Sequence, residues 1–101
     1  MQPSVSVDEV TPGTLLLDVR EDYEWADGHI EGAIHIPMNE IPGAVAAGVE
    51  WLTPDTPVVV VCHVGARSAR VAGWLNSQGY TAINLDGGMH AWMLAGRPIV
   101  A

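Results

Sequence analysis

Short apolar runs alternate with helical patterns along the 101-residue chain, and this alternation predicts an α/β fold. The runs at 15–17, 58–61 and 82–85 predict strands, and shorter strand candidates lie at 5–7 and 34–36. Four consecutive valines at 58–61 are typical of a strand that is buried on both faces, as in the interior of a parallel sheet. We therefore expect the run at 58–61 to form the central strand.

Apolar residues at helical spacing fill the segments between these strands. They predict a brief helix at 22–26, a longer one over 39–52, a third from Ser68 to near Gly79, and a fourth through 91–94. Because parallel crossovers are right-handed, the helices should cover both faces of the sheet. The expected architecture is a single domain over 1–101 with three layers, in which a mainly parallel central sheet lies between helices.

Three polar residues each close one of the apolar runs. They are Asp18, Cys62 and Asp86. In open parallel sheets, functional sites form beyond the carboxyl ends of the strands. We therefore expect these three residues to line one rim of the sheet.

Charge and composition narrow the possible partners. The formal net charge is −8, which argues against nucleic acid and against anionic membrane surfaces. No segment approaches the run of about 18 apolar residues that spans a membrane, and the N-terminal residues lack the basic flank and apolar run of a signal peptide. The single cysteine excludes an internal disulfide and fits a reducing compartment. The expectation is a soluble cytoplasmic protein.

The only cysteine directly follows the four valines, and the loop from Cys62 to Arg67 leads into the third predicted helix. Gly65 can supply the positive φ that such a loop needs. The free amides at a helix start, together with nearby arginine, favour the thiolate, which is the nucleophilic form of cysteine. A buried, inert cysteine is the alternative. Gly65, Arg67 and the helix start favour the reactive form.

Charge around this loop is also uneven. No acidic residue lies between Asp55 and Asp86, while Arg67 and Arg70 lie inside that stretch. Exposed charges more than about 8 Å apart are largely screened at physiological salt. A small anion near Cys62 should therefore feel mainly the local positive region.

Three motifs, in this order along the chain, resemble those of rhodanese-like sulfurtransferases. They are 17–21 followed by 28–37, then Cys62-x-x-Gly65-x-Arg67-Ser68, and then 84–92. The resemblance implies a three-layer rhodanese-like domain with sulfurtransferase activity, in which Cys62 is the catalytic nucleophile. It also implies a substrate-binding loop made of His63, Val64, Gly65, Ala66 and Arg67.

The reaction that we hypothesise begins with attack of the Cys62 thiolate on the outer sulfur of thiosulfate or of another sulfane donor, which releases sulfite and leaves a persulfide. Amides of residues 63–67 would stabilise the negative sulfur, and Arg67 would hold the anionic donor. Cyanide or a thiol would then accept the sulfur. Since the chain has no second cysteine, the acceptor must be another molecule, such as a sulfur-relay protein. No cofactor is expected.

Supporting roles fall to Asp18, Arg20 and Ser68. Asp18 and Arg20 flank one residue, so their side chains can face the same side, and a salt bridge that fixes the loops is favoured over catalysis. The four histidines are scattered and form no spaced pair typical of a zinc site, so no metal is expected. His63 lies within the loop, where it could shape the pocket or carry charge.

Two other functions stay open. A non-catalytic rhodanese-like module that binds a partner would usually lack the nucleophile, whereas Cys62 is present. A cysteine phosphatase or arsenate reductase has a similar loop, but phosphatases place five residues between cysteine and arginine, and only four separate Cys62 from Arg67. The shorter loop makes a smaller ring of amides, which suits one sulfur atom better than a phosphate.

Overall fold

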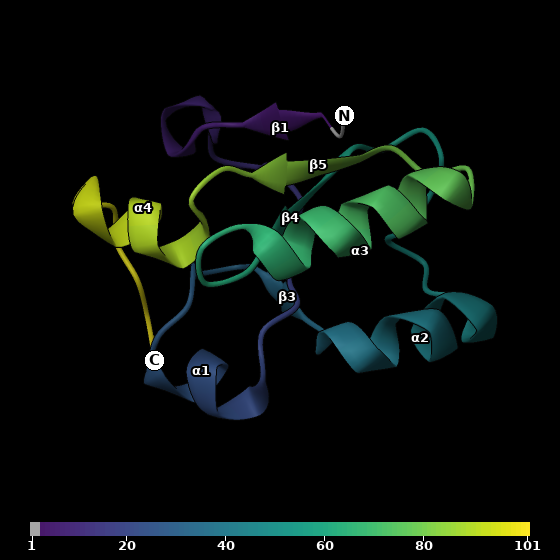
Figure 1. The fold of residues 1–101 in the computed structure, drawn as a ribbon, viewed down its shortest axis with the longest axis horizontal. Helices are drawn as coiled ribbons and strands as arrows, with labels where there is room; N and C mark the ends of the chain where they lie inside the picture. The colour runs from purple at the N-terminus through teal and green to yellow at the C-terminus, as the bar shows by residue number, and fades with distance from the viewer. Residues whose placement is uncertain (1–2) are drawn as a thin grey trace.

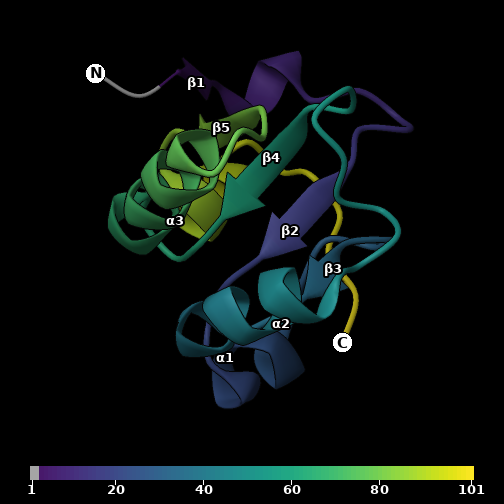
Figure 2. The same ribbon diagram turned by 90° about the vertical axis from the view of Figure 1, so that its right-hand side faces the viewer.

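A parallel sheet of five strands forms the middle layer of the structure, a computed structural model that describes residues 3–101. The strands are β1 (Ser4–Val5), β2 (Leu16–Asp18), β3 (Ile34–His35), β4 (Val58–Val61) and β5 (Ala82–Leu85). Their order is β1-β5-β4-β2-β3, and neighbouring strands are parallel (Figures 1 and 2). β4 is the central strand, as predicted. The predicted span 1–101 includes residues 1 and 2, which lie outside the described residues.

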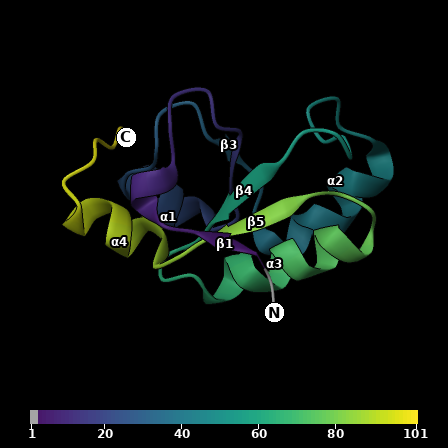
Figure 3. The same ribbon diagram turned by 90° about the horizontal axis from the view of Figure 1, so that it is seen from above.

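Helices cover both faces of this sheet. They are α1 (Asp22–Asp27), α2 (Ile41–Ala47), α3 (Ala66–Ser77) and α4 (Gly88–Leu94), with 3-10 turns η1 (Val7–Glu9) and η2 (Met38–Glu40). Residues of α2 and α3 pack on one face, and residues of η1 and α4 pack on the other (Figure 3). The predicted three-layer α/β architecture is confirmed. Within residues 3–101, none of the helices is both long enough and apolar enough to cross a bilayer.

The valines of β4 supply the core on both faces. Val58 and Val60 pack with α2 and α3, whereas Val59 and Val61 pack with η1 and α4. Each of the four is at most 5% exposed. Burial of one such side chain is worth roughly 1.5–3 kcal/mol. The run of four valines is thus explained by a strand that has helices on both sides.

Two helices differ from their predicted bounds. The helix predicted over 39–52 is shorter, because Gly48 adopts a φ of +82° and ends α2, while a 3-10 turn precedes it. α3 begins at Ala66, two residues before the predicted start at Ser68, because Gly65 adopts a φ of +107° at the N-cap. As a result, Arg67 and Ser68 belong to the first turn of α3.

The start of α4 is joined to the end of β4 through the backbone. The Met89 amide donates to the Cys62 carbonyl at 2.8 Å, and the His90 amide donates to the His63 carbonyl at 2.9 Å. Gly88 permits this approach: its φ is +54°, and a Cβ at this position would lie 2.2 Å from the Cys62 carbonyl oxygen. Figure 1 shows the starts of α3 and α4 side by side beyond the ends of β4 and β5. The loop after Cys62 is therefore fixed from both sides.

Replacement of Gly88 by alanine should destabilise the fold more than the same change at Gly96. Both glycines have positive φ, but a Cβ at Gly96 would meet no atom within 4 Å. The left-handed backbone costs about 1–2 kcal/mol at either position, and the clash at Gly88 should add about 1–3 kcal/mol. Urea unfolding of both variants measures the difference. Equal free energies of unfolding would contradict the backbone junction described here.

Candidate active site

Cys62 is the first residue after β4, and its side chain lies at the carboxyl end of the sheet beneath the first turn of α3. The residue is only 1% exposed. The backbone amide of Gly65 donates to the Cys62 Sγ at 3.0 Å, and the Ser68 hydroxyl lies 3.2 Å from the same atom. The sulfur is therefore enclosed by hydrogen-bond donors instead of by apolar groups alone.

These donors decide the protonation of the thiol. Burial raises the pKa of the Cys62 thiol, because it penalises the charged form. The Ser68 hydroxyl and the backbone amides of Ser68, Gly65 and Arg67 act in the opposite direction and outweigh burial, so the net pKa lies below the ordinary value. The chemical consequence is a larger thiolate fraction at neutral pH.

Ser68 connects the sulfur to a residue that sequence reasoning missed. Its hydroxyl lies 2.5 Å from the Asn84 Oδ1 as well as near the Cys62 Sγ. A hydroxyl has one proton and can donate to only one of these acceptors at a time. Asn84 is only 8% exposed and stands opposite Val60 in the sheet. The available signal was a polar residue inside the otherwise apolar strand 82–85.

Arg67 forms an ion pair with Glu24 on α1. Its Nη1 lies 2.7 Å from Glu24 Oε1 and its Nη2 lies 2.8 Å from Glu24 Oε2. The hydrogen bonds from Arg67 lower the pKa of Glu24 to about 2, and the pKa of Arg67 is raised by the same partner. Glu24 was also missed, because an acid in the first turn of a short helix is explained equally well by the helix dipole.

Asp18 and Arg20 form a buried ion pair. None of the side-chain hydrogen bonds described for these two residues involves Cys62. The Nε and Nη2 atoms of Arg20 bond the Asp18 carboxylate at 2.8–3.0 Å, and both residues are at most 5% exposed. Arg20 also donates to the carbonyls of Glu24 and Gly28, at the middle and the end of α1. The favoured interpretation, a pair that fixes the loops, fits these contacts.

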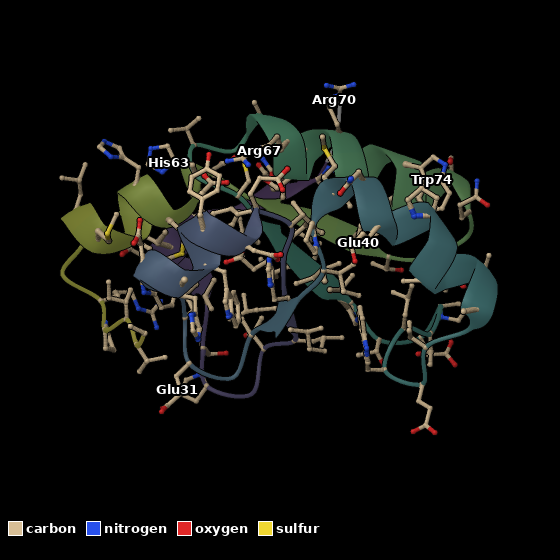
Figure 4. All side chains as sticks on the ribbon, turned by 90° about the horizontal axis from the view of Figure 1, so that it is seen from below. Glu31, Glu40, His63, Arg67, Arg70 and Trp74 are labelled. Atoms are coloured by element: carbon tan, nitrogen blue, oxygen red, sulfur yellow. The ribbon has the colours of Figure 1, made fainter. Side chains whose placement is uncertain are left out.

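Three other predicted loop residues are open to solvent. His63, Val64 and Ala66 are exposed, as is Asp86, which the sequence placed on the same rim. Figure 4 shows Arg67 between His63 and Arg70 along one edge of the molecule. His63 also borders a cavity of about 260 Å³ that Glu24 lines from α1. Within residues 3–101, no group of three or more histidine, cysteine or acidic residues is arranged to hold a metal ion.

The family model described as "Rhodanese-like domain" matches residues 7–95, which include all of the site residues above. The chain belongs to the rhodanese-like domain family. The resemblance drawn from the three sequence motifs is thereby confirmed. The match covers every strand except β1 and every helix of the fold.

Relatives of this rhodanese-like chain carry the name of one enzyme class. A sulfurtransferase of Allochromatium vinosum is 40% identical over 92 residues, which cover 90% of this chain and 82% of that protein. The thiosulfate sulfurtransferase GlpE of Stutzerimonas stutzeri is 33% identical over 81 residues, or 79% of this chain and 71% of that protein. These similarities support a sulfurtransferase role.

Solved structures agree with the fold. A rhodanese-related protein of Thermoplasma volcanium superposes with a TM-score of 0.87 at 29% identity, and the match covers 97% of each chain. A rhodanese-like domain protein of Staphylococcus aureus gives a TM-score of 0.79 at 36% identity over 90% of this chain and 91% of that one. The structure therefore has a rhodanese fold.

Removal of the Ser68 hydroxyl should make the thiol of this rhodanese-like chain harder to ionise. A hydrogen bond to a charged group is worth about 1.5 kcal/mol, so Ser68→Ala should raise the pKa of Cys62 and reduce the thiolate fraction at neutral pH by about tenfold. Ultraviolet absorbance of the thiolate, followed against pH, measures the pKa of Cys62 in each variant. Ser77→Ala, at the exposed end of α3, is the control. An unchanged pKa of Cys62 in Ser68→Ala would show that the hydroxyl does not stabilise the thiolate.

Loss of the Asp18 carboxylate should destabilise the whole fold. Asp18→Ala leaves the Arg20 guanidinium buried without its anion, which costs about 3–5 kcal/mol. Asp55→Ala removes an exposed carboxylate in the turn before β4 and should change stability by less than about 0.5 kcal/mol. Chemical unfolding of both variants tests the contrast, and a tolerant Asp18→Ala variant would argue against a structural pair.

Proposed function

We propose that the chain is a sulfurtransferase that carries a sulfane sulfur as a persulfide on Cys62. The observation that supports this proposal most strongly is the set of donors around one sulfur atom. The amides of Gly65, Arg67 and Ser68 and the Ser68 hydroxyl lower the thiol pKa despite burial. A site built in this way stabilises negative charge on sulfur, both before transfer and on the persulfide after it.

In the proposed first step, the Cys62 thiolate attacks the outer sulfur of thiosulfate. A bond forms between Sγ and that sulfur, the sulfur–sulfur bond of thiosulfate breaks, and its electron pair leaves with sulfite. The charges balance, because a thiolate and thiosulfate become a persulfide anion and sulfite. No external oxidant or reductant is needed. A persulfide on another molecule could deliver sulfur in the same way, with a thiolate leaving in place of sulfite.

Arg67 is the proposed partner of the anionic donor. It lies in the first turn of α3, next to the amides that face Cys62, and it is partly exposed. No acidic residue lies between Asp55 and Asp86 in the sequence, so Arg67 and Arg70 are the charged side chains of that stretch apart from the Cys62 thiolate. The donor would thus be attracted by a local cation although the chain as a whole carries a charge of −8.

The second step passes the sulfur to a nucleophilic acceptor. Cyanide or a thiolate attacks the outer persulfide sulfur, and the electron pair of the broken bond returns to Cys62 as a thiolate. Cys62 is the only cysteine, so no internal disulfide can resolve the persulfide. The acceptor is therefore a small thiol, cyanide or a sulfur-relay protein. A free thiol of this kind suits the reducing cytoplasm.

Thiosulfate should add the mass of one sulfur atom to the protein. The expected adduct is absent from Cys62→Ser and disappears when cyanide or a small thiol is added, with thiocyanate as the cyanide product. Intact-protein mass spectrometry measures all three outcomes. If no adduct forms, a partner-binding module is the better description, and release of phosphate from an aryl phosphate would indicate a phosphatase.

A further inference from the structure

Access to Cys62 requires a change in the described arrangement, because the residue is 1% exposed. On the α1 side, the carboxylate of Glu24 contacts Arg67 in the first turn of α3. Its side chain is 16% exposed and faces the guanidinium of Arg67, whose side chain is 31% exposed. A donor that binds the edge of Arg67 facing Glu24 must therefore displace this carboxylate.

Glu24 uses both of its oxygens on Arg67, at 2.7 and 2.8 Å. A planar guanidinium presents two parallel N–H groups and binds two oxygens of a carboxylate or of a tetrahedral oxyanion equally well. The carboxylate of Glu24 thus occupies the Nη1–Nη2 edge of the guanidinium, an edge through which a sulfonate-type group of a sulfur donor could also bind. Within residues 3–101, Glu24 is the acidic residue that forms an ion pair with Arg67.

The helix that carries Glu24 is held by hydrogen bonds and ring stacking, without a fully buried side chain of its own. α1 has six residues, and none of them is buried. Arg20 binds the Glu24 and Gly28 carbonyls, and Trp25 stacks on the rings of His29 and His35. A short helix with little buried apolar area costs less to displace than the core helices do. Withdrawal of Glu24 on α1 should therefore cost less than displacement of α3.

We propose that Glu24 occupies the anion position on Arg67 in the resting protein, and that an anionic sulfur donor reaches Cys62 by displacing this carboxylate. The proposal rests on the proposed function in one respect, namely that the displacing anion is a sulfur donor. Glu24 is then a specificity-determining residue: it selects donors with an oxyanion that can bridge the guanidinium, and it disfavours neutral donors.

In this proposal, a competing anion releases the Glu24 carboxylate from Arg67, and protonation of the carboxylate does not. Its pKa of about 2 keeps the carboxylate ionised at the pH of the cell. An entering oxyanion instead exchanges one charged partner of Arg67 for another, so the exchange leaves no buried charge unpaired. A neutral molecule offers no such exchange and leaves the ion pair in place.

The decisive experiment compares alkylation of Cys62 by anionic iodoacetate and by neutral iodoacetamide. Both reagents need the same thiolate, so the ratio of their rates cancels any change in the thiol pKa. Glu24→Gln frees Arg67, and the ratio of the iodoacetate rate to the iodoacetamide rate should rise by about tenfold. Asp22→Asn removes the same charge from an 89% exposed position on α1 and should change the ratio by less than about twofold.

Steady-state kinetics with thiosulfate provide the second readout. Displacement predicts that Glu24→Gln lowers the KM for thiosulfate by about tenfold with little change in kcat. If Glu24 instead only orients Arg67 for the donor, the KM rises and the alkylation ratio stays unchanged or falls, and either result overturns the proposal.

Two controls keep the test decisive. Glu24→Asp retains the charge but shortens the side chain, so it should raise the alkylation ratio by an intermediate amount, and it replaces Glu24→Gln if that variant fails to fold in a thermal melt. Alkylation does not depend on sulfur transfer. A raised ratio in a protein that forms no thiosulfate adduct would therefore support the role of Glu24 while removing the proposed function.

Discussion

A negatively charged sulfur inside a protein needs hydrogen-bond donors, and the rest of this structure depends on how they are provided. β4 ends at Val61, and the turn at Gly65 directs the first amides of α3 back toward the Cys62 Sγ. The turn favours glycine, since Gly65 has a φ of +107°, a backbone conformation that costs a residue with a Cβ about 1–2 kcal/mol. Amides at the start of α4 bind the Cys62 and His63 carbonyls. The loop after β4 is therefore fixed both by its own amide, which bonds the sulfur, and by these carbonyls.

Two arginines at the rim of the sheet form ion pairs of different kinds. Arg20 is buried with Asp18 and ties α1 to the end of β2 through backbone carbonyls, which is a structural task. Arg67 is partly exposed and binds the Glu24 side chain instead. The first pair would leave an uncompensated buried charge if it broke, whereas the second is proposed to exchange its anion with one from solution. Under this proposal, stability and reactivity depend on different ion pairs, and both arginines contact α1.

Local patterns were enough to predict the strands, the layers and the position of Cys62. The four valines and Gly65 each favoured one physical explanation, and the motifs favoured the reactive form of the lone cysteine over an inert one. Asn84 and Glu24 were not predictable in the same way, because their roles depend on contacts across 16 and 43 positions of the sequence. The start of α3 was placed two residues late, because the φ of Gly65, not the apolar pattern, sets it. The burial of Cys62 had no sequence signal that separates it from an open site.

The titration of Cys62 in the unmodified protein tests the central claim most directly. Thiolate absorbance followed against pH yields the pKa of the one cysteine in the chain, with Cys62→Ser as the blank. The account predicts a midpoint clearly below the value of about 8.5 for a free cysteine, because the amides and the Ser68 hydroxyl outweigh burial. A midpoint at or above that value would mean that burial dominates, and that the sulfur is not held as the anion that sulfur transfer requires.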